Sequence, residues 1–165
     1  MIGGGDFSAD RIIPDCVRAA VKKEKIIVRN PYSIRPYQHV LEPLSAYLMV
    51  MQRQYEDINL SGYYNVGPDD SGCVSTGHLA DLFCRAWGSR QSWETPTGDR
   101  KSVHEDRLLK LDCSKIKAVF GWRPRWGITE AVEKTVEWTR AYYSNGDICS
   151  LMDRQISDYL KNGDK

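Results

Sequence analysis

Apolar residues recur along this chain at two alternating spacings, one typical of helices and one of short strands. The first helical pattern is predicted to begin with Asp10 as its N-cap and to run through Lys23. Its apolar face consists of Ile13, Val17, Ala20 and Val21. The segment 25–29 (KIIVR) then predicts a strand, which ends at the turn Asn30-Pro31.

A second helix is predicted from Pro43, because proline suits the first turn of a helix. One face of it carries Leu44, Tyr47, Leu48, Met51 and Tyr55. The segment 62–67 (GYYNVG) predicts a strand between turn signals. A third helix is predicted with Ser75 or Thr76 as its cap and Gly88 as its stop, and its inward residues are Leu79, Leu82, Phe83, Ala86 and Trp87.

The last third of the chain begins with a polar, irregular stretch over 91–107. A short strand is predicted at 108–111 and a short helix at 114–120, which ends at Gly121. Thr129 is predicted to cap a longer helix, and a final helix is predicted over about 150–160. The fold class is therefore mixed α/β, and we expect residues 1–165 to form one unit without a separate domain boundary.

The composition of the chain argues against several classes of binding partner and bound group. The net charge is +1, so the sequence offers no electrostatic footprint for nucleic acid or for anionic lipid. The longest apolar run, 46–51, is far shorter than a membrane span. Five scattered cysteines without C-x-x-C spacing predict neither a disulfide framework nor a zinc site. We expect a cytoplasmic protein with reduced cysteines that binds neither nucleic acid nor membrane.

Several catalytic motifs are missing from the sequence. Gly3-Gly4-Gly5 is followed by Asp6 and does not match the dinucleotide-binding pattern G-x-G-x-x-G. No tyrosine is followed by a lysine four residues later, and neither H-E-x-x-H nor G-x-S-x-G occurs. The residues of this chain therefore predict no catalytic group, no cofactor-binding motif and no metal site.

The strongest candidate for ligand binding is Arg35. It precedes Pro36, which biases its backbone toward an extended conformation, and a fixed guanidinium there could grip a diphosphate through two parallel hydrogen bonds. The alternative is a structural ion pair, for example with Glu42. Arg11, at the start of the first helix, is a second candidate for phosphate, and its alternative is a solvated charge on the helix surface.

Two further places carry polar groups that could contact a ligand. His104, Glu105 and Arg107 could surround a ribose or a phosphate, or could belong to an ordinary solvated loop. Asn65 lies between aromatic residues and glycines, where its side chain could bind a ligand or could hydrogen-bond backbone across a turn. The three tryptophans Trp122, Trp126 and Trp138 are expected to pack in a core rather than to stack on a base.

Several strings in the sequence resemble the C-terminal half of the extended short-chain dehydrogenases/reductases that act on nucleotide sugars, and most closely the CDP-glucose 4,6-dehydratases. The string IRPYQHVLEPL together with GGGD and LKLDCSK is the most specific part of this resemblance. The Phe at position 7 stands where that family has a tryptophan. The matching strings span residues 2–7, 10–15, 34–44, 64–68, 104–105, 109–115 and 121–126.

The resemblance implies a C-terminal substrate-binding lobe with the last strand and helix elements of a Rossmann-like fold, while the N-terminal half that binds NAD is absent. It implies a lyase that converts CDP-glucose to CDP-4-dehydro-6-deoxyglucose for deoxysugars of surface lipopolysaccharide, with a homo-oligomer for the full-length enzyme. It assigns Arg35 to the diphosphate, Arg11 to phosphate or sugar, and His104 with Glu105 to the ribose or cytosine. A noncatalytic remnant and a relative acting on dTDP- or UDP-sugars remain as alternatives.

Overall fold

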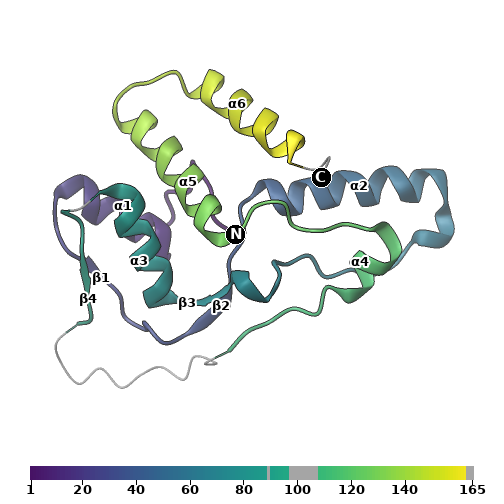
Figure 1. Ribbon diagram of the computed structural model, residues 1–165, viewed down its shortest axis with the longest axis horizontal. Helices are drawn as coiled ribbons and strands as arrows, with labels where there is room; N and C mark the ends of the chain where they lie inside the picture. Colours follow the sequence, from purple (N-terminus) through teal and green to yellow (C-terminus); the bar gives the residue numbers. More distant parts are fainter. Residues whose placement is uncertain (89, 97–107, 163–165) are drawn as a thin grey trace.

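The computed structural model describes residues 1–88, 90–96 and 108–162, and it consists of helices with two small two-stranded sheets (Figure 1). The helices are α1 (Ile12–Lys22), α2 (Leu41–Glu56), α3 (Thr76–Trp87), α4 (Ser114–Phe120), α5 (Ile128–Tyr143) and α6 (Ile148–Lys161), with 3₁₀ turns at Ile58–Leu60 and Asp70–Gly72. The strands are β1 (Ile26–Ile27), β2 (Ile34–Pro36), β3 (Cys73–Ser75) and β4 (Trp93–Glu94). The mixed α/β class expected from the sequence is confirmed.

The first helix differs from its prediction at both its start and its inner face. Arg11 occupies the N-cap without a side-chain cap bond, while Asp10 adopts a left-handed backbone with φ of 59°. Asp10 is therefore not the cap that the sequence predicts. Val21 was also placed wrongly on the inner face, since 41% of it is exposed, whereas Ile13, Val17 and Ala20 are buried.

The second helix begins at Leu41, two residues before Pro43, and it extends away from the other long helices (Figure 1). Its regular row of large apolar side chains lies on the surface of this chain, with exposed fractions between 46% and 94%. We call this row the α2 stripe, and it consists of Leu44, Tyr47, Leu48, Met51 and Tyr55.

The two sheets join segments that are distant in sequence. Strand β1 pairs with β4 in parallel, and β2 pairs with β3 antiparallel, so that Arg35 lies opposite Val74. The strands predicted at 62–67 and 108–111 are wrong, because the first stretch is irregular and Leu108 makes only an isolated bridge to Ile34. In the first stretch the Val66 carbonyl accepts a hydrogen bond from the Gln38 side chain at 3.3 Å, and the structure gives it no strand partner among the described residues.

Capping explains where the remaining helices begin. The Ser75 hydroxyl accepts a hydrogen bond from the backbone N–H of His78 at 3.1 Å, which confirms the predicted cap of α3. Thr129 is not a cap, because α5 already begins at Ile128 after Gly127. The Asp147 carboxylate accepts from the backbone N–H of Ser150 and starts α6 two residues before the predicted Ser150.

The buried apolar side chains form two clusters. The larger cluster joins α1, α3 and α5 and is centred on Leu79, Phe83 and Val132. The smaller cluster lies between α2 and α4 and consists of Ala46, Cys113, Ile116 and Trp122. Trp122 and Trp126 are buried, as the core assignment of the tryptophans predicts, whereas Trp138 is only half-buried and stacks on Tyr142. All five cysteines are free thiols.

A buried carboxylate links α2 to the last part of the chain. Glu42 is fully buried, and its Oε1 accepts from the backbone N–H groups of Arg125 at 3.0 Å and Trp126 at 2.8 Å. Its Oε2 accepts from the Tyr159 hydroxyl at 2.8 Å. Three donors from two distant segments therefore satisfy this buried side chain at the start of α2. In the described ranges no helix is long and apolar enough to cross a membrane.

Candidate functional site

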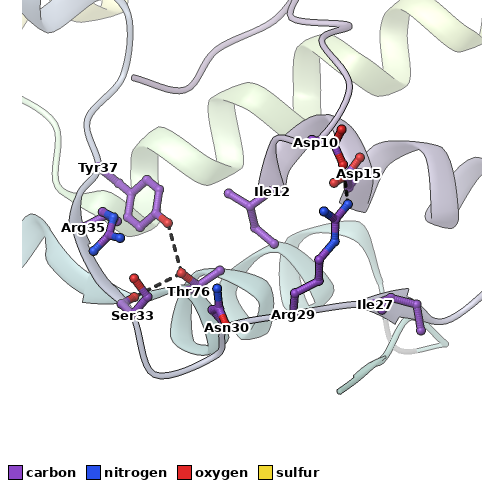
Figure 2. Close-up of a pocket in the computed structure, with 10 residues that line it drawn as sticks. All are labelled: Asp10, Ile12, Asp15, Ile27, Arg29, Asn30, Ser33, Arg35, Tyr37 and Thr76. Atoms are coloured by element: carbon purple, nitrogen blue, oxygen red, sulfur yellow. Dashed lines mark hydrogen bonds and ion pairs between the residues drawn. The ribbon is translucent and has the colours of Figure 1, made fainter. Parts of the chain in front are cut away.

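A cavity of about 270 Å³ opens where α1 and α3 begin, and Arg35 is part of its wall (Figure 2). Polar side chains form most of the wall, and two isoleucines form its apolar part. The lining residues are Asp10, Ile12, Asp15, Ile27, Arg29, Asn30, Ser33, Arg35, Tyr37 and Thr76.

Strand β2 fixes the backbone of Arg35 through its pairing with Val74. The half-buried Arg35 guanidinium donates to the Ile34 carbonyl at 3.0 Å. The ion pair with Glu42, which the sequence left open, does not form, because the Glu42 carboxylate is bound by Arg125, Trp126 and Tyr159. The sequence prediction that a pre-proline arginine is held in an extended segment is confirmed.

Hydroxyl groups lie beside Arg35 in the same part of the cavity. The Tyr37 hydroxyl is 3.3 Å from the Thr76 Oγ1, which donates to the Ser33 carbonyl at 3.1 Å (Figure 2). Ser33 is only 8% exposed, and its hydroxyl has no hydrogen-bond partner among the described residues. The first N–H groups of α3 donate to the carbonyls of Ser33 and Pro31, so side chains rather than the helix end must supply the donors for a ligand here.

The other end of the cavity holds an ion pair between Asp10 and Arg29 (Figure 2). The hydrogen bond from Arg29 lowers the pKa of the Asp10 carboxyl, and the same bond raises the pKa of the Arg29 guanidinium. Asp15 also lines the cavity and is paired with Arg18 on the same helix. The cavity therefore has the Arg35 guanidinium at one end and the Asp10–Arg29 ion pair at the other.

Arg11 lies next to this cavity rather than inside it. Its side chain is 66% exposed and is 3.8 Å from the Asp6 carboxylate. It lines a second cavity of about 160 Å³, which shares Ile12 and Tyr37 with the first. The structure thus brings Arg11 and Arg35 to neighbouring cavities on either side of two common residues.

The remaining candidates are separated from these cavities or lie outside the described residues. The Asn65 side chain is exposed and donates to the Asp112 carbonyl at 3.1 Å, so it bonds backbone in this structure. His104, Glu105 and Arg107 lie outside the described ranges. Sequence reasoning did not find Asp10, Arg29 or Ser33 as cavity residues, although all three lie within a few residues of the predicted candidates.

The described residues do not assemble a reaction centre. No three metal-ligating side chains come together in the ranges that the structure describes. His39 follows the strand that carries Arg35, but it is only 3% exposed, and burial together with the nearby Lys134 lowers the pKa of His39 to about 4. Its imidazole is therefore neutral at pH 7, and its Nδ1 accepts from the Leu41 N–H at 3.3 Å. The arrangement around Arg35 is suited to binding an anionic group.

Comparison with known sequences gives one match over nearly the whole chain. CDP-glucose 4,6-dehydratase of Salmonella typhimurium is 44% identical over 161 residues, which is 97% of this chain and 44% of that protein. A dTDP-glucose 4,6-dehydratase of Streptomyces antibioticus is 37% identical over 65 residues, which is 39% of this chain and 18% of that protein. No family model matches the chain. The chain spans less than half the length of the Salmonella enzyme.

Comparison with solved structures agrees on the fold. A dTDP-glucose 4,6-dehydratase from Bacillus anthracis in complex with NAD has a TM-score of 0.64 and 19% identity, covering 86% of this chain and 42% of that one. A UDP-galactose 4-epimerase has a TM-score of 0.63 and 20% identity, covering 86% and 43%. The chain thus shares its fold with the matching part of sugar-nucleotide dehydratases and epimerases.

Proposed function

We propose that this chain is the nucleotide-sugar-binding portion of a CDP-glucose 4,6-dehydratase. The observation that carries the proposal is the position of Arg35, which β2 fixes in the wall of a cavity beside the hydroxyls of Tyr37 and Thr76. A guanidinium with neighbouring hydroxyl donors suits a diphosphate. The 44% identity over 97% of the chain supports the assignment to the CDP-glucose enzyme over the dTDP-glucose relatives, which match a shorter stretch.

The reaction would be the loss of water from CDP-glucose to give CDP-4-dehydro-6-deoxyglucose. NAD, held by the other part of the enzyme, would supply hydride removal and return. The residues of this chain would bind the substrate: Arg35 would hold the diphosphate, and Arg11 in the adjoining cavity would contact a phosphate or the sugar. His104, Glu105 and Arg107 would approach the ribose. Binding energy from the nucleotide would position the sugar for reaction.

This chain alone would be inactive, because it holds neither a dinucleotide-binding motif nor a Tyr-x-x-x-Lys pair. The α2 stripe supports this view, since a row of large apolar side chains on a surface marks a contact with another protein segment. We assign that contact to the rest of the dehydratase, within a cytoplasmic homo-oligomer that serves deoxysugar synthesis for lipopolysaccharide. Residues 1–165 would act in it as one unit.

Titration of the chain with CDP by isothermal calorimetry tests the proposal. Arg35→Ala should weaken CDP binding by roughly 10- to 150-fold, because a charge-assisted bidentate contact contributes on the order of 1.5–3 kcal/mol. Arg35→Lys should recover only part of the affinity, since an ammonium keeps the charge and loses the planar fork. Arg53→Ala, which removes an exposed arginine near the far end of α2, serves as the matched control. Equal CDP affinity in the wild type and in a folded Arg35→Ala variant would contradict the assignment.

A further inference from the structure

The Asp10–Arg29 pair occupies a position that stability alone does not explain. Aspartate is a favoured N-cap residue, yet in this chain Asp10 lies one position before the cap, and Arg11 takes the cap without a side-chain bond. Asp10 also adopts a left-handed backbone, which is uncommon for a residue other than glycine. Its bond to Arg29 contributes little in return, because both side chains are mostly exposed, at 72% and 58%. A backbone outlier of this kind suggests a role in binding.

The loop that carries Asp10 is held in place by a neighbouring arginine. Arg18 donates to the carbonyl of Phe7 at 3.3 Å and to the carbonyl of Ser8 at 3.1 Å. The N–H of Ser8 in turn donates to the Asp6 carboxylate at 3.0 Å. The backbone before Asp10 is therefore anchored, and the bond from Arg29 orients the Asp10 carboxylate, which lowers the entropic cost of binding.

The cavity has one end for an anion and another for a neutral polar group. Arg35 and the hydroxyls of Tyr37 and Thr76 lie at one end, and the Asp10–Arg29 pair lies at the other (Figure 2). Ile12 and Ile27 supply the apolar part of the wall, and its volume of about 270 Å³ is close to the lower end for small-molecule sites, about 300 Å³. A nucleoside diphosphate has the same division, with a charged end and a flat, uncharged base.

We propose that Asp10 and Arg29 read the base of the nucleotide and select cytosine over uracil. The inference rests on the proposed function, because it takes the diphosphate to be bound at Arg35. An ionised carboxylate only accepts hydrogen bonds and a guanidinium only donates them. Cytosine presents an N4 amino group as a donor beside N3 as an acceptor, which matches a carboxylate beside a guanidinium. Uracil in the same position turns its O4 acceptor toward the Asp10 carboxylate, and the two acceptors repel.

Calorimetric titration of the 165-residue chain with three ligands tests this inference. The ligands are CDP, UDP and the CDP analogue with 2-pyrimidinone as its base, which lacks only the N4 amino group. The wild type should bind CDP about tenfold more tightly than either of the other two, the discrimination expected of one bidentate base contact. Asp10→Asn should reduce the preference for CDP over the analogue without abolishing it, because its amide oxygen still accepts from N4 but carries no negative charge. The loss of the Asp10 carboxylate and the loss of the N4 amino group can be combined in a double-mutant cycle, and their non-additivity measures the hydrogen bond between these two groups.

A second variant and a matched control keep the test decisive. Asp10→Gly removes the side chain and tolerates the left-handed backbone, so it should lose the preference for CDP while the chain stays folded. Glu94→Gln breaks the exposed Lys25–Glu94 pair outside the cavity and should leave the preference unchanged. If Asp10→Gly binds CDP and still prefers it to UDP and the analogue as strongly as the wild type does, the base-reading role is wrong, while the proposed function stands. A wild-type chain that binds none of the three ligands would overturn both.

Discussion

Replacing Glu42 by glutamine removes a negative charge from a fully buried position while keeping the shape of the side chain. In the native protein this carboxylate accepts hydrogen bonds from the backbone N–H groups of Arg125 and Trp126 and from the Tyr159 hydroxyl. After the substitution one oxygen becomes an NH₂ group, which cannot accept from these donors. The packing stays the same, so the change isolates the hydrogen bonds and the charge.

The expected magnitude follows from those three contacts. A hydrogen bond to a charged group contributes about 1 kcal/mol more than a neutral one, so three contacts predict a loss of about 3 kcal/mol in the free energy of unfolding. For a domain of this size that corresponds to a fall in Tm of about 6–12 °C. Removing the Tyr159 hydroxyl in a Glu42→Gln background should cost less than in the wild type, because the two groups share one bond.

Urea unfolding followed by tryptophan fluorescence measures this loss, since the buried Trp126 is itself one of the donors. Glu56→Gln, at the exposed end of the same helix, is the matched control and should change the free energy of unfolding by less than about 0.5 kcal/mol. A Glu42→Gln variant as stable as the Glu56→Gln control would refute the view that Glu42 links α2 to the last part of the chain.

Three further predictions follow from other parts of the molecule. Burial lowers the pKa of His39 from its ordinary value of about 6.5 to about 4, so the neutral form favours the folded state. The free energy of unfolding should therefore be at its full value above pH 6.5 and should fall by about 3 kcal/mol as the pH drops to 4. Unfolding measured across that range should show a shallower fall in His39→Gln, and parallel curves for the two proteins would contradict the assignment. The α2 stripe should bind a hydrophobic dye. The double change Leu48→Gln with Met51→Gln should at least halve the dye fluorescence, whereas Leu160→Gln on α6 should not. Equal effects of the two changes would argue against a specific surface on α2. With CDP-glucose and NAD the chain alone should form no keto sugar, and alkaline absorbance above that of a protein-free blank would refute this.

The parts of the fold that depend on local signals were predictable from the sequence. The helix α3 follows from its Ser75 cap and the Gly88 stop, and α4 ends at Gly121 as expected, because these residues act on their own backbone. Helical spacing alone could not show that the α2 stripe is exposed, since periodicity shows that a face is apolar but not what covers it. The resemblance did predict it, because the half of the family's fold on which this helix would pack lies outside the matching strings, and the exposure is confirmed.

The candidate site likewise contains residues that the sequence could predict and residues that it could not. Arg35 could be found because a proline follows it and limits its backbone. The Asp10–Arg29 pair could not, because it joins residues 19 positions apart and displaces Asp10 from the cap that local rules assign to it. The strand predicted at 62–67 failed for a related reason. Its alternating apolar residues Tyr64 and Val66 pack against the smaller core cluster, without a strand edge beside them.

The division of the core into two clusters has a consequence for how the chain opens. The cluster between α2 and α4 has only four buried members, while the cluster around α1, α3 and α5 is much larger. Parts of a protein with fewer buried contacts open at lower free energy than global unfolding. Amide protons in α2 and α4 should therefore exchange with deuterated solvent through a sub-global opening, whereas those in α3 and α5 should exchange only through global unfolding. Since the α2 stripe belongs to the less stable unit, a binding partner on that face would slow exchange most where the isolated chain is least protected.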